Sequence, residues 1–139
     1  MSGYTKDIRR ICQQVLKLGG MRVADGGDCL FDIEKDAKRT DWRLWSGSKT
    51  GRNTGNFRVC KSAKGYKMET SKCHRNSAVI ADMKGWDMYT GLALSRDGIW
   101  RVHSWVVAKT GRLYETTIPR VLYFGCKQDS KEVADVLAW

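Results

Sequence analysis

Three short strings of the sequence carry side chains that can perform acyl-transfer chemistry together. They are Cys73-His74-Arg75-Asn76, His103-Ser104-Trp105 and Glu115-Thr116-Thr117. A cysteine that opens a helix, a histidine within a strand and a carboxylate about one hairpin later follow the order of a thiol nucleophile, its general base and the group that orients the base. The sequence therefore predicts a catalytic triad of Cys73, His103 and Glu115.

The surroundings of Cys73 favour its reactive thiolate form. Ser71 is a good helix cap, so we expect Cys73 in the first turn, where unpaired N–H groups and the helix dipole stabilise negative charge. Its neighbours Lys72, His74 and Arg75 add positive charge nearby. The alternative is that Cys73 is a small buried hydrophobe, which is the usual role of a free cysteine.

Turn length decides whether Glu115 can reach His103. The strand expected over Ile99–Ala108 alternates between two faces, and His103 lies on the less apolar one. If the loop Lys109-Thr110-Gly111 closes with Gly111 in the left-handed position of a bulged turn, Glu115 becomes the diagonal neighbour of His103. A two-residue or four-residue loop places Glu115 on the opposite face, and the triad does not form.

Four further residues are candidates for contact with a substrate. A bulged turn at Arg96-Asp97-Gly98 would set Gly91 opposite His103, and a glycine there would leave space beside the imidazole. Asn76, three residues after Cys73, either donates to an oxyanion or caps its own turn. The four candidates are Asn76, Gly91, Arg101 and Trp105.

The hydrophobic pattern predicts the elements that must position these residues. The N-terminal half is expected to hold a helix capped by Thr5 and ended by Gly19-Gly20, with an apolar side of Ile8, Ile11, Cys12, Val15 and Leu16. A hairpin over Met21–Ile33, a helix as the alternative reading of Asp32–Trp45, a loop over Ser46–Asn56 and a strand at Phe57–Cys60 follow it. The C-terminal half is expected to begin with a helix from Ser71 to Gly85, with an apolar side of Ala78, Val79, Ala81 and Met83. Strands at Met88–Ser95, Ile99–Ala108, Leu113–Ile118 and Arg120–Phe124 and a helix over Ser130–Leu137 are expected to follow.

The length of the chain and its apolar content favour one domain. The chain has 139 residues, of which 42% are hydrophobic, enough for one core but not comfortably for two. We expect an α+β fold in which the helix bearing the cysteine packs on an antiparallel meander. Within a single domain over 1–139, we expect a helical and loop-rich subregion over 1–70, a catalytic core over 71–125 and a C-terminal helix over 126–139.

The net charge of +10 favours acidic partners. A protein or peptide substrate is the first candidate, and nucleic acid is the second. The alternative to an enzyme is a basic module that binds nucleic acid or protein, of which a phage-encoded host-interaction protein is one form. In such a module Trp86, Trp100 and Trp105 could stack bases, although tryptophans in strands more often pack in the core. No apolar run approaches the roughly 18 residues of a membrane span. The N-terminus lacks the apolar core of a signal peptide, so we expect a cytoplasmic protein without membrane contact.

The five cysteines, an odd number without paired spacing, are expected to be free thiols. A zinc shell of Cys60, Cys73, His74 and Cys126 is the alternative. It lacks the close Cys-x2-Cys pair that structural zinc sites use. We therefore expect neither a metal nor a cofactor.

A cysteine at a helix start, a histidine on the following sheet and an acid on the next strand resemble the papain-like superfamily, which includes bacterial cell-wall amidopeptidases and transglutaminase-like proteins. His103-Ser104-Trp105-Val106, followed by Gly111 and Glu115-Thr116-Thr117, is similar to the transglutaminase-like pattern His-Ala-Trp-Val, Gly and Asp-x-Thr. A group of small, uncharacterised bacterial and phage proteins resembles the chain further, through Cys73-His74-x-Asn76, Tyr89-x-Gly91-x-Ala93-Leu94, Gly98-x-Trp100-Arg101-x-His103-Ser104-Trp105, Glu115-Thr116-Thr117 and Tyr123-Phe124-Gly125.

This resemblance covers about residues 73–125 and implies a papain-like core with the activity of a cysteine hydrolase or acyltransferase. It implies Cys73 as nucleophile, His103 as base and Glu115 as the orienting acid. The chain departs from the superfamily in two ways. It has no amide side chain shortly before Cys73 and no aromatic residue directly after it, so the resemblance does not assign the oxyanion donors.

Overall fold

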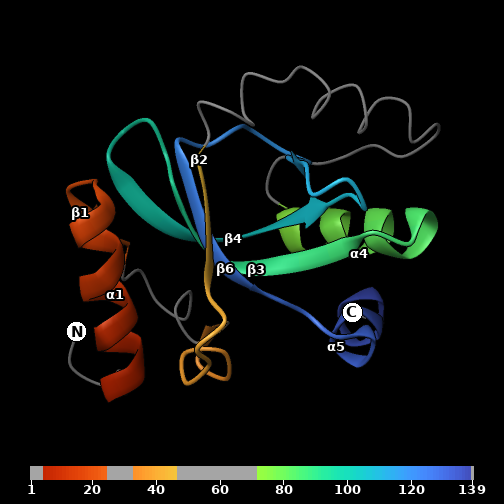
Figure 1. Ribbon diagram of the computed structural model, residues 1–139, viewed down its shortest axis with the longest axis horizontal. Coiled ribbons are helices and arrows are strands. Elements are labelled where there is room, and N and C mark those ends of the chain that lie inside the picture. The colour runs from red at the N-terminus through yellow and green to blue at the C-terminus, as the bar shows by residue number, and fades with distance from the viewer. Residues whose placement is uncertain (1–4, 25–32, 47–71, 139) are drawn as a thin grey trace.

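The computed structural model describes residues 5–24, 33–46 and 72–138. In these ranges three helices accompany a six-stranded, mostly antiparallel sheet, which confirms the α+β class (Figure 1). The elements are α1 (Lys6–Leu18), β1 (Arg22–Val23), β2 (Arg43–Ser46), α4 (Cys73–Lys84), β3 (Asp87–Leu94), β4 (Ile99–Val107), β5 (Leu113–Tyr114), β6 (Leu122–Lys127) and α5 (Ser130–Leu137).

The order of the strands differs from a simple meander. The sheet runs β1-β4-β3-β6-β2, and β5 pairs with β4 outside that path. Strand β6 therefore lies beside β3 instead of following β5, because the chain crosses over the sheet between Glu115 and Val121. The N–H of Val121 ends this crossing by donating to the carbonyl of Leu94 at 2.7 Å.

Helix α1 forms as its sequence predicts, with one exception. Thr5 caps it by accepting a hydrogen bond from the N–H of Ile8 at 3.2 Å, and Gly19 follows its last residue. Leu16 was expected on the apolar side but is exposed. The residues of α1 that enter the core are Ile8, Ile11, Cys12 and Val15.

Helix α4 carries Cys73 as its first residue and ends at Gly85, whose φ of 67° is left-handed. Its N-cap position is Lys72, which makes no side-chain cap bond. The expected cap Ser71 lies outside the described residues. Met83, expected on the apolar side of this helix, is exposed.

The short elements of the N-terminal half correct one expectation and leave another as a prediction. Strand β1 pairs in parallel with the start of β4, and the turn and most of the second strand of the hairpin expected over Met21–Ile33 lie outside the described residues. Residues 43–46 form β2 against β6 and not the end of a charged helix. The expected loop over Ser46–Asn56 beyond its first residue and the expected strand Phe57–Cys60 lie outside the described residues.

The sheet is buried on both faces. Thr90, Ser104 and Cys126 lie on the face that α1 and α4 cover, since their strand neighbours pack with those helices. The opposite face, which carries His103, was expected to be the less apolar one, but it holds a second core. This core consists of Trp45, Tyr89, Ala93, Trp105, Val107, Leu113 and Tyr123.

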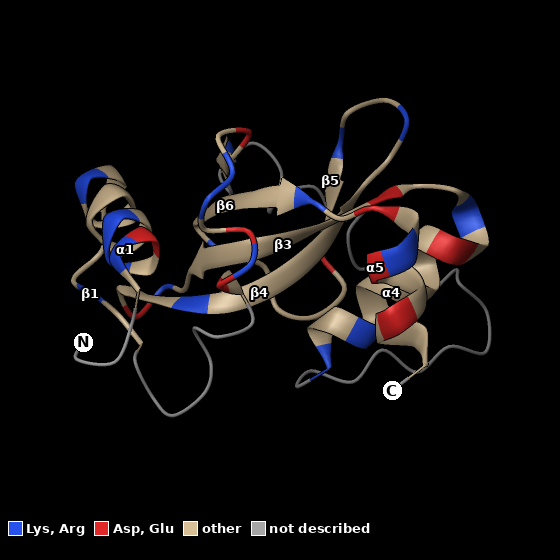
Figure 2. Cartoon of the chain, turned by 90° about the horizontal axis from the view of Figure 1, so that it is seen from below, with Lys and Arg blue, Asp and Glu red and all other residues tan. Residues whose placement is uncertain are grey.

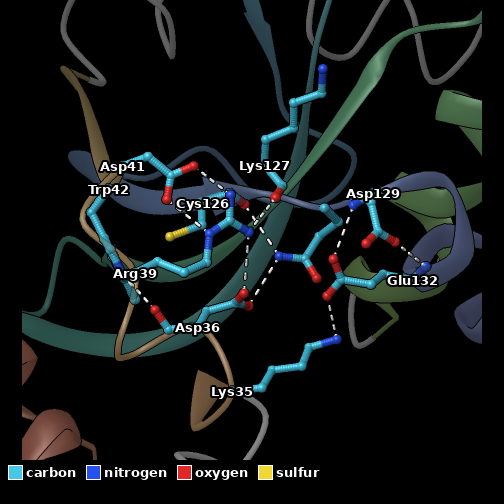
Figure 3. A network of polar contacts seen from close by, with 10 residues as sticks. Lys35, Asp36, Arg39, Asp41, Trp42, Cys126, Lys127, Asp129 and Glu132 are labelled. Carbon is cyan, nitrogen blue, oxygen red and sulfur yellow. Dashed lines mark hydrogen bonds and ion pairs between the residues drawn. The ribbon is translucent and has the colours of Figure 1, made fainter.

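Arg39 ties the segment before β2 to the end of β6 (Figure 3). Its guanidinium pairs with Asp41 and Asp36, and Nη1 donates to the carbonyl of Lys127 at 2.7 Å. The buried carboxylate of Asp36 also accepts a hydrogen bond from Nε2 of Gln128 at 3.0 Å. These contacts fix residues 33–41 against the helix-bearing side of the sheet.

Candidate active site

The turn between β4 and β5 has the length that the triad requires. The N–H of Ala108 donates to the carbonyl of Arg112 at 2.9 Å, and Gly111 has a φ of 88°. Val107 then pairs with Leu113 and Val106 with Tyr114, and Glu115 is the next residue along the chain. The expected three-residue loop with a left-handed Gly111 is confirmed.

Glu115 accepts hydrogen bonds on both of its carboxylate oxygens and is fully buried. Its Oε1 accepts from Nε2 of His103 at 2.7 Å and from the hydroxyl of Tyr123 at 2.8 Å. Its Oε2 accepts from both the N–H and the hydroxyl of Thr117 at 3.0 Å. This set of donors holds the carboxylate ionised and fixes the imidazole plane, which also lies against the ring of Trp105.

Cys73 and His103 reach each other from different layers of the molecule. Cys73 comes from the helix-bearing side, whereas His103 points from the opposite face of β4. They meet at the outer edge of β4, where the described strands β1 and β5 pair only with its two ends. The thiol and the imidazole form a side-chain hydrogen bond there, and the N–H of Ser104 donates to the same sulfur. Because Nε2 of His103 is held by Glu115, the nitrogen that faces the sulfur is Nδ1.

The electrostatics of this arrangement favour a thiolate–imidazolium pair. Burial alone raises the pKa of Cys73, but the hydrogen bond and charge of His103, with the N–H of Ser104, bring that pKa below its ordinary value. Burial alone lowers the pKa of His103, but Glu115 and Cys73 together raise it to about 9. Burial opposes ionisation of Glu115 as well, yet the charge and hydrogen bond of His103 keep its pKa low.

These pKa directions predict an unusual pH profile for Cys73. Its alkylation rate should level off at a pH below the ordinary thiol range, because the thiolate is already formed there. Since the pKa of His103 is raised, the stabilisation from its charged form is complete below pH 6.5 and is lost as the pH rises through about 9. The alkylation rate is measured by peptide-resolved haloacetamide labelling between about pH 4 and pH 10, a range that brackets the ordinary pKa values of these groups. The pH dependence of stability is measured by chemical unfolding. A Cys73 rate that climbs only above pH 8, as for an ordinary thiol, contradicts the pair.

Gly91 lies opposite His103, as the turn at Arg96-Asp97-Gly98 predicts, but for a different reason than the one expected. A Cβ on Gly91 would lie 2.2 Å from the carbonyl oxygen of Phe124 and 2.4 Å from the Cα of Gly125. The space beside this glycine is therefore filled by the backbone of β6. The expectation that Gly91 leaves room for a substrate is wrong, and its role is close packing of strands.

Replacing Gly91 with alanine should accordingly destabilise the fold by about 3 kcal/mol, the upper range for an overpacked core site. Gly85→Ala is the matched control. Its Cβ would meet nothing within 4 Å, so only the left-handed backbone, worth about 1–2 kcal/mol, is affected. Urea unfolding of both variants makes the comparison. Equal losses of unfolding free energy would argue against a steric role for Gly91.

The other expected substrate contacts have different outcomes. Trp105 is fully buried in the core, so its side chain supports the site from within and offers no substrate surface, which corrects that expectation. Arg101 is exposed two residues before His103 and is paired with Asp97 at 2.8 Å. Asn76 is buried one helical turn after Cys73, with its N–H bonded to the carbonyl of Lys72 at 2.9 Å. Contact of Arg101 or Asn76 with a substrate stays a prediction.

The tryptophans considered as stacking platforms are mostly in the core. Trp100 is fully buried and donates through Nε1 to the carbonyl of Gly19 at 2.9 Å. Trp86 is half-buried and stacks on Tyr114 at a ring-centroid distance of 5.0 Å. Neither Trp100 nor Trp105 is available to a base in this structure.

Two groups at the site were not among the residues predicted from sequence. Tyr123, from β6, supplies the second hydrogen bond to Oε1 of Glu115, and burial with the nearby carboxylate raises the pKa of its hydroxyl. Its only signal was membership in the string Tyr123-Phe124-Gly125. The role of the Ser104 backbone N–H could not be predicted from the sequence, because every residue except proline carries this donor.

The surroundings differ for the other described cysteines. Cys12 and Cys126 are buried, and burial raises the pKa of both thiols, that of Cys126 to about 12. Within residues 5–24, 33–46 and 72–138, no three His, Cys, Asp or Glu side chains come together as a candidate metal site. Cys60, a member of the zinc shell considered above, lies outside these ranges.

A cavity of about 600 Å³ opens on the helix-bearing side of the sheet. It lies between residues 34–38, the start of α4 and α5, and the ring of His74 forms part of its wall. Lys and Arg dominate the surface of α1 at the other end of the sheet, whereas acids and bases are mixed on α4 and α5 (Figure 2).

In the described part of the chain, no helix combines the length and apolarity that a membrane span requires. Comparison of the chain with protein-family models, with curated proteins and with solved structures finds no match.

Proposed function

We propose that this chain is a cysteine-dependent hydrolase or acyltransferase that acts on an amide, peptide, isopeptide or related acyl bond. The observation that carries the proposal is the buried 2.7 Å bond between His103 and Glu115, which leaves the other nitrogen of the same imidazole for the Cys73 thiol. We further propose that the α4–β4 unit corresponds to a papain-like core, with a protein or peptide as substrate.

The proposed reaction has two steps, the formation of a thioester on Cys73 and its release to water or an amine. The Cys73 thiolate attacks the carbonyl carbon, and the carbonyl π electrons move to oxygen. As the tetrahedral intermediate collapses, Nδ1–H of His103 gives its proton to the leaving amine, and a thioester remains. Water or an acceptor amine then attacks the thioester while Nδ1 takes its proton. Collapse releases the acyl product and restores the thiolate–imidazolium pair.

The first-turn position of Cys73 supports stabilisation of the oxyanion. The N–H groups at the start of a helix have no partners within that helix, and they point along its axis toward the N-terminal end. The N–H of Cys73 is one of these donors. An anion forming next to the sulfur would meet this donor, which is the requirement for an oxyanion site.

Selective chemistry at Cys73 tests the proposal. Wild-type protein is treated with limiting haloacetamide at pH 6, and in parallel with an activated acyl ester, and each cysteine is quantified by peptide mass spectrometry. We expect both reagents to modify Cys73 first, because its pKa is lowered, whereas Cys12 and Cys126 are buried with raised pKa values. The acyl adduct should turn over in water, and the Cys73→Ala variant should not form it. Equal modification of all five thiols would sink the proposal.

A basic binding module without catalysis is the alternative, and the basic surface of α1 is the feature that favours it (Figure 2). It predicts binding to nucleic acid that weakens steeply with salt and is unchanged in Cys73→Ala. The burial of Trp100 and Trp105 removes two of the three stacking surfaces that this alternative invoked, and the third, Trp86, is half-buried against Tyr114.

A further inference from the structure

The start of α4 and the middle of β4 touch at two consecutive residues of each. The side chains of Cys73 and His103 form one hydrogen bond, and Nδ1 of His74 forms another with Oγ of Ser104 at 2.5 Å. Successive side chains of a strand point to opposite faces, so these two pairs lie on opposite sides of β4. The first turn of α4 is therefore attached to β4 from both faces.

Ser104 joins the two contacts within a single residue. Its backbone N–H donates to the sulfur of Cys73, and its hydroxyl bonds with His74 and, at 2.7 Å, with the hydroxyl of Thr90 on β3. Its side chain is fully buried. A displacement of Ser104 therefore also displaces the backbone N–H that donates to the sulfur of Cys73.

Among the described residues, no N-cap side chain holds the first turn of α4 in place. Lys72 occupies the N-cap position and makes no side-chain cap bond. A side-chain cap bond is one usual means of holding a first turn, and a helix without that bond depends more on its tertiary contacts. The contact between His74 and Ser104 supplies an anchor one residue after Cys73.

We propose that His74 and Ser104 are positioning residues, and that the bond between their side chains fixes the sulfur of Cys73 against Nδ1 of His103. This inference rests on the proposed function, since it concerns how the nucleophile and base of that function are held together. A hydrogen bond weakens steeply with distance and angle, so loosening the first turn reduces the fraction of thiolate at a given pH. Neither residue needs to touch the substrate in this role.

The test is the pH profile of Cys73 alkylation in four variants, with thermal unfolding measured for each. His74→Ala should lower the rate at pH 6 about tenfold and move the midpoint of the profile up by about one unit, the effect of weakening one hydrogen bond to a charged group. His74→Asn places an amide near the position of Nδ1 and should recover most of the rate. Ser104→Ala removes the hydroxyl but keeps the N–H, and should resemble His74→Ala.

The matched control is Arg75→Ala, the fourth variant. Arg75 lies in the same turn but donates to the carbonyl of Leu137 at 3.1 Å, away from β4. Since its guanidinium is held at Leu137, we expect the loss of its charge to move the midpoint much less than His74→Ala does. If Arg75→Ala shifts the midpoint as far as His74→Ala, general loosening of α4 explains the effect and the inference is wrong.

The remaining outcomes separate this inference from the proposed function. Wild-type protein whose Cys73 is not selectively alkylated refutes the function itself. Selective wild-type labelling with an unchanged profile in folded His74→Ala and Ser104→Ala refutes only the positioning role. A His74→Asn variant as slow as His74→Ala also refutes it, because the hydrogen bond then is not what matters. If His74→Ala does not fold, comparison of Ser104→Ala with Ser104→Thr, which keeps a hydroxyl, gives the same decision.

Discussion

Replacing His103 with glutamine should slow the alkylation of Cys73 at pH 6 by about a hundredfold or more, the difference between an activated and an ordinary thiol. Without the imidazolium, the influences left on the pKa of Cys73 are burial and the charge of Glu115, which raise it, and the N–H of Ser104, which lowers it. The thiol therefore stays protonated where the wild-type thiolate reacts. Peptide-resolved labelling at several pH values measures the shift.

Glutamine is chosen over alanine because Glu115 is fully buried. Alanine at position 103 leaves that carboxylate without the cation it pairs with, and removing one partner of a buried ion pair costs about 3–5 kcal/mol. The amide of glutamine can still donate to Glu115, so the variant separates loss of the base from loss of folding. Rapid labelling of Cys73 in a folded His103→Gln protein would show that the imidazole does not activate the sulfur.

The part of the site that depends on local turns could be predicted from sequence. Gly98 and Gly111 lie in left-handed backbone conformations, with φ of 86° and 88°. A glycine at the third loop position favours a three-residue bulged turn. The length of that turn decides which residues of the two strands share a face of the sheet. Parity then places Gly91 opposite His103 and brings Glu115 to the same face as the imidazole.

The parts that depend on distant pairing could not be predicted. The alternation within β4 says that His103 and Ser104 point to opposite faces, but not that both faces are buried. It also does not say that β6 returns beside β3, which is the pairing that brings Tyr123 to Glu115. A long-range strand order leaves no local trace in the sequence, and the role of Gly91 was misjudged for the same reason. Its close neighbour is the backbone of β6.

Replacing Glu115 with glutamine should have the second large effect, on the basicity of His103. Burial by itself lowers the pKa of this imidazole, and the charge of Glu115 is the largest influence that raises it to about 9. Loss of one close charge moves a pKa by about 1–3 units, and the pKa of His103 should therefore fall to its ordinary range or below. The pair then prefers a neutral thiol and a neutral imidazole at pH 7. Nuclear magnetic resonance titration of the His103 ring measures the shift directly.

The same variant should lose about 1–3 kcal/mol of unfolding free energy, because the new amide group is a donor among buried donors. Tyr123→Phe is the matched control. It removes one hydrogen bond to the same oxygen, at 2.8 Å, and the acceptor of the Arg120 N–H, at 2.9 Å, and keeps the charge of Glu115. The loss of these two hydrogen bonds should lower stability by about 1–3 kcal/mol and leave the His103 pKa raised. If Glu115→Gln and Tyr123→Phe titrate alike, the hydrogen-bond frame and not the carboxylate charge sets the state of His103, and the thiolate–imidazolium pair loses its electrostatic basis.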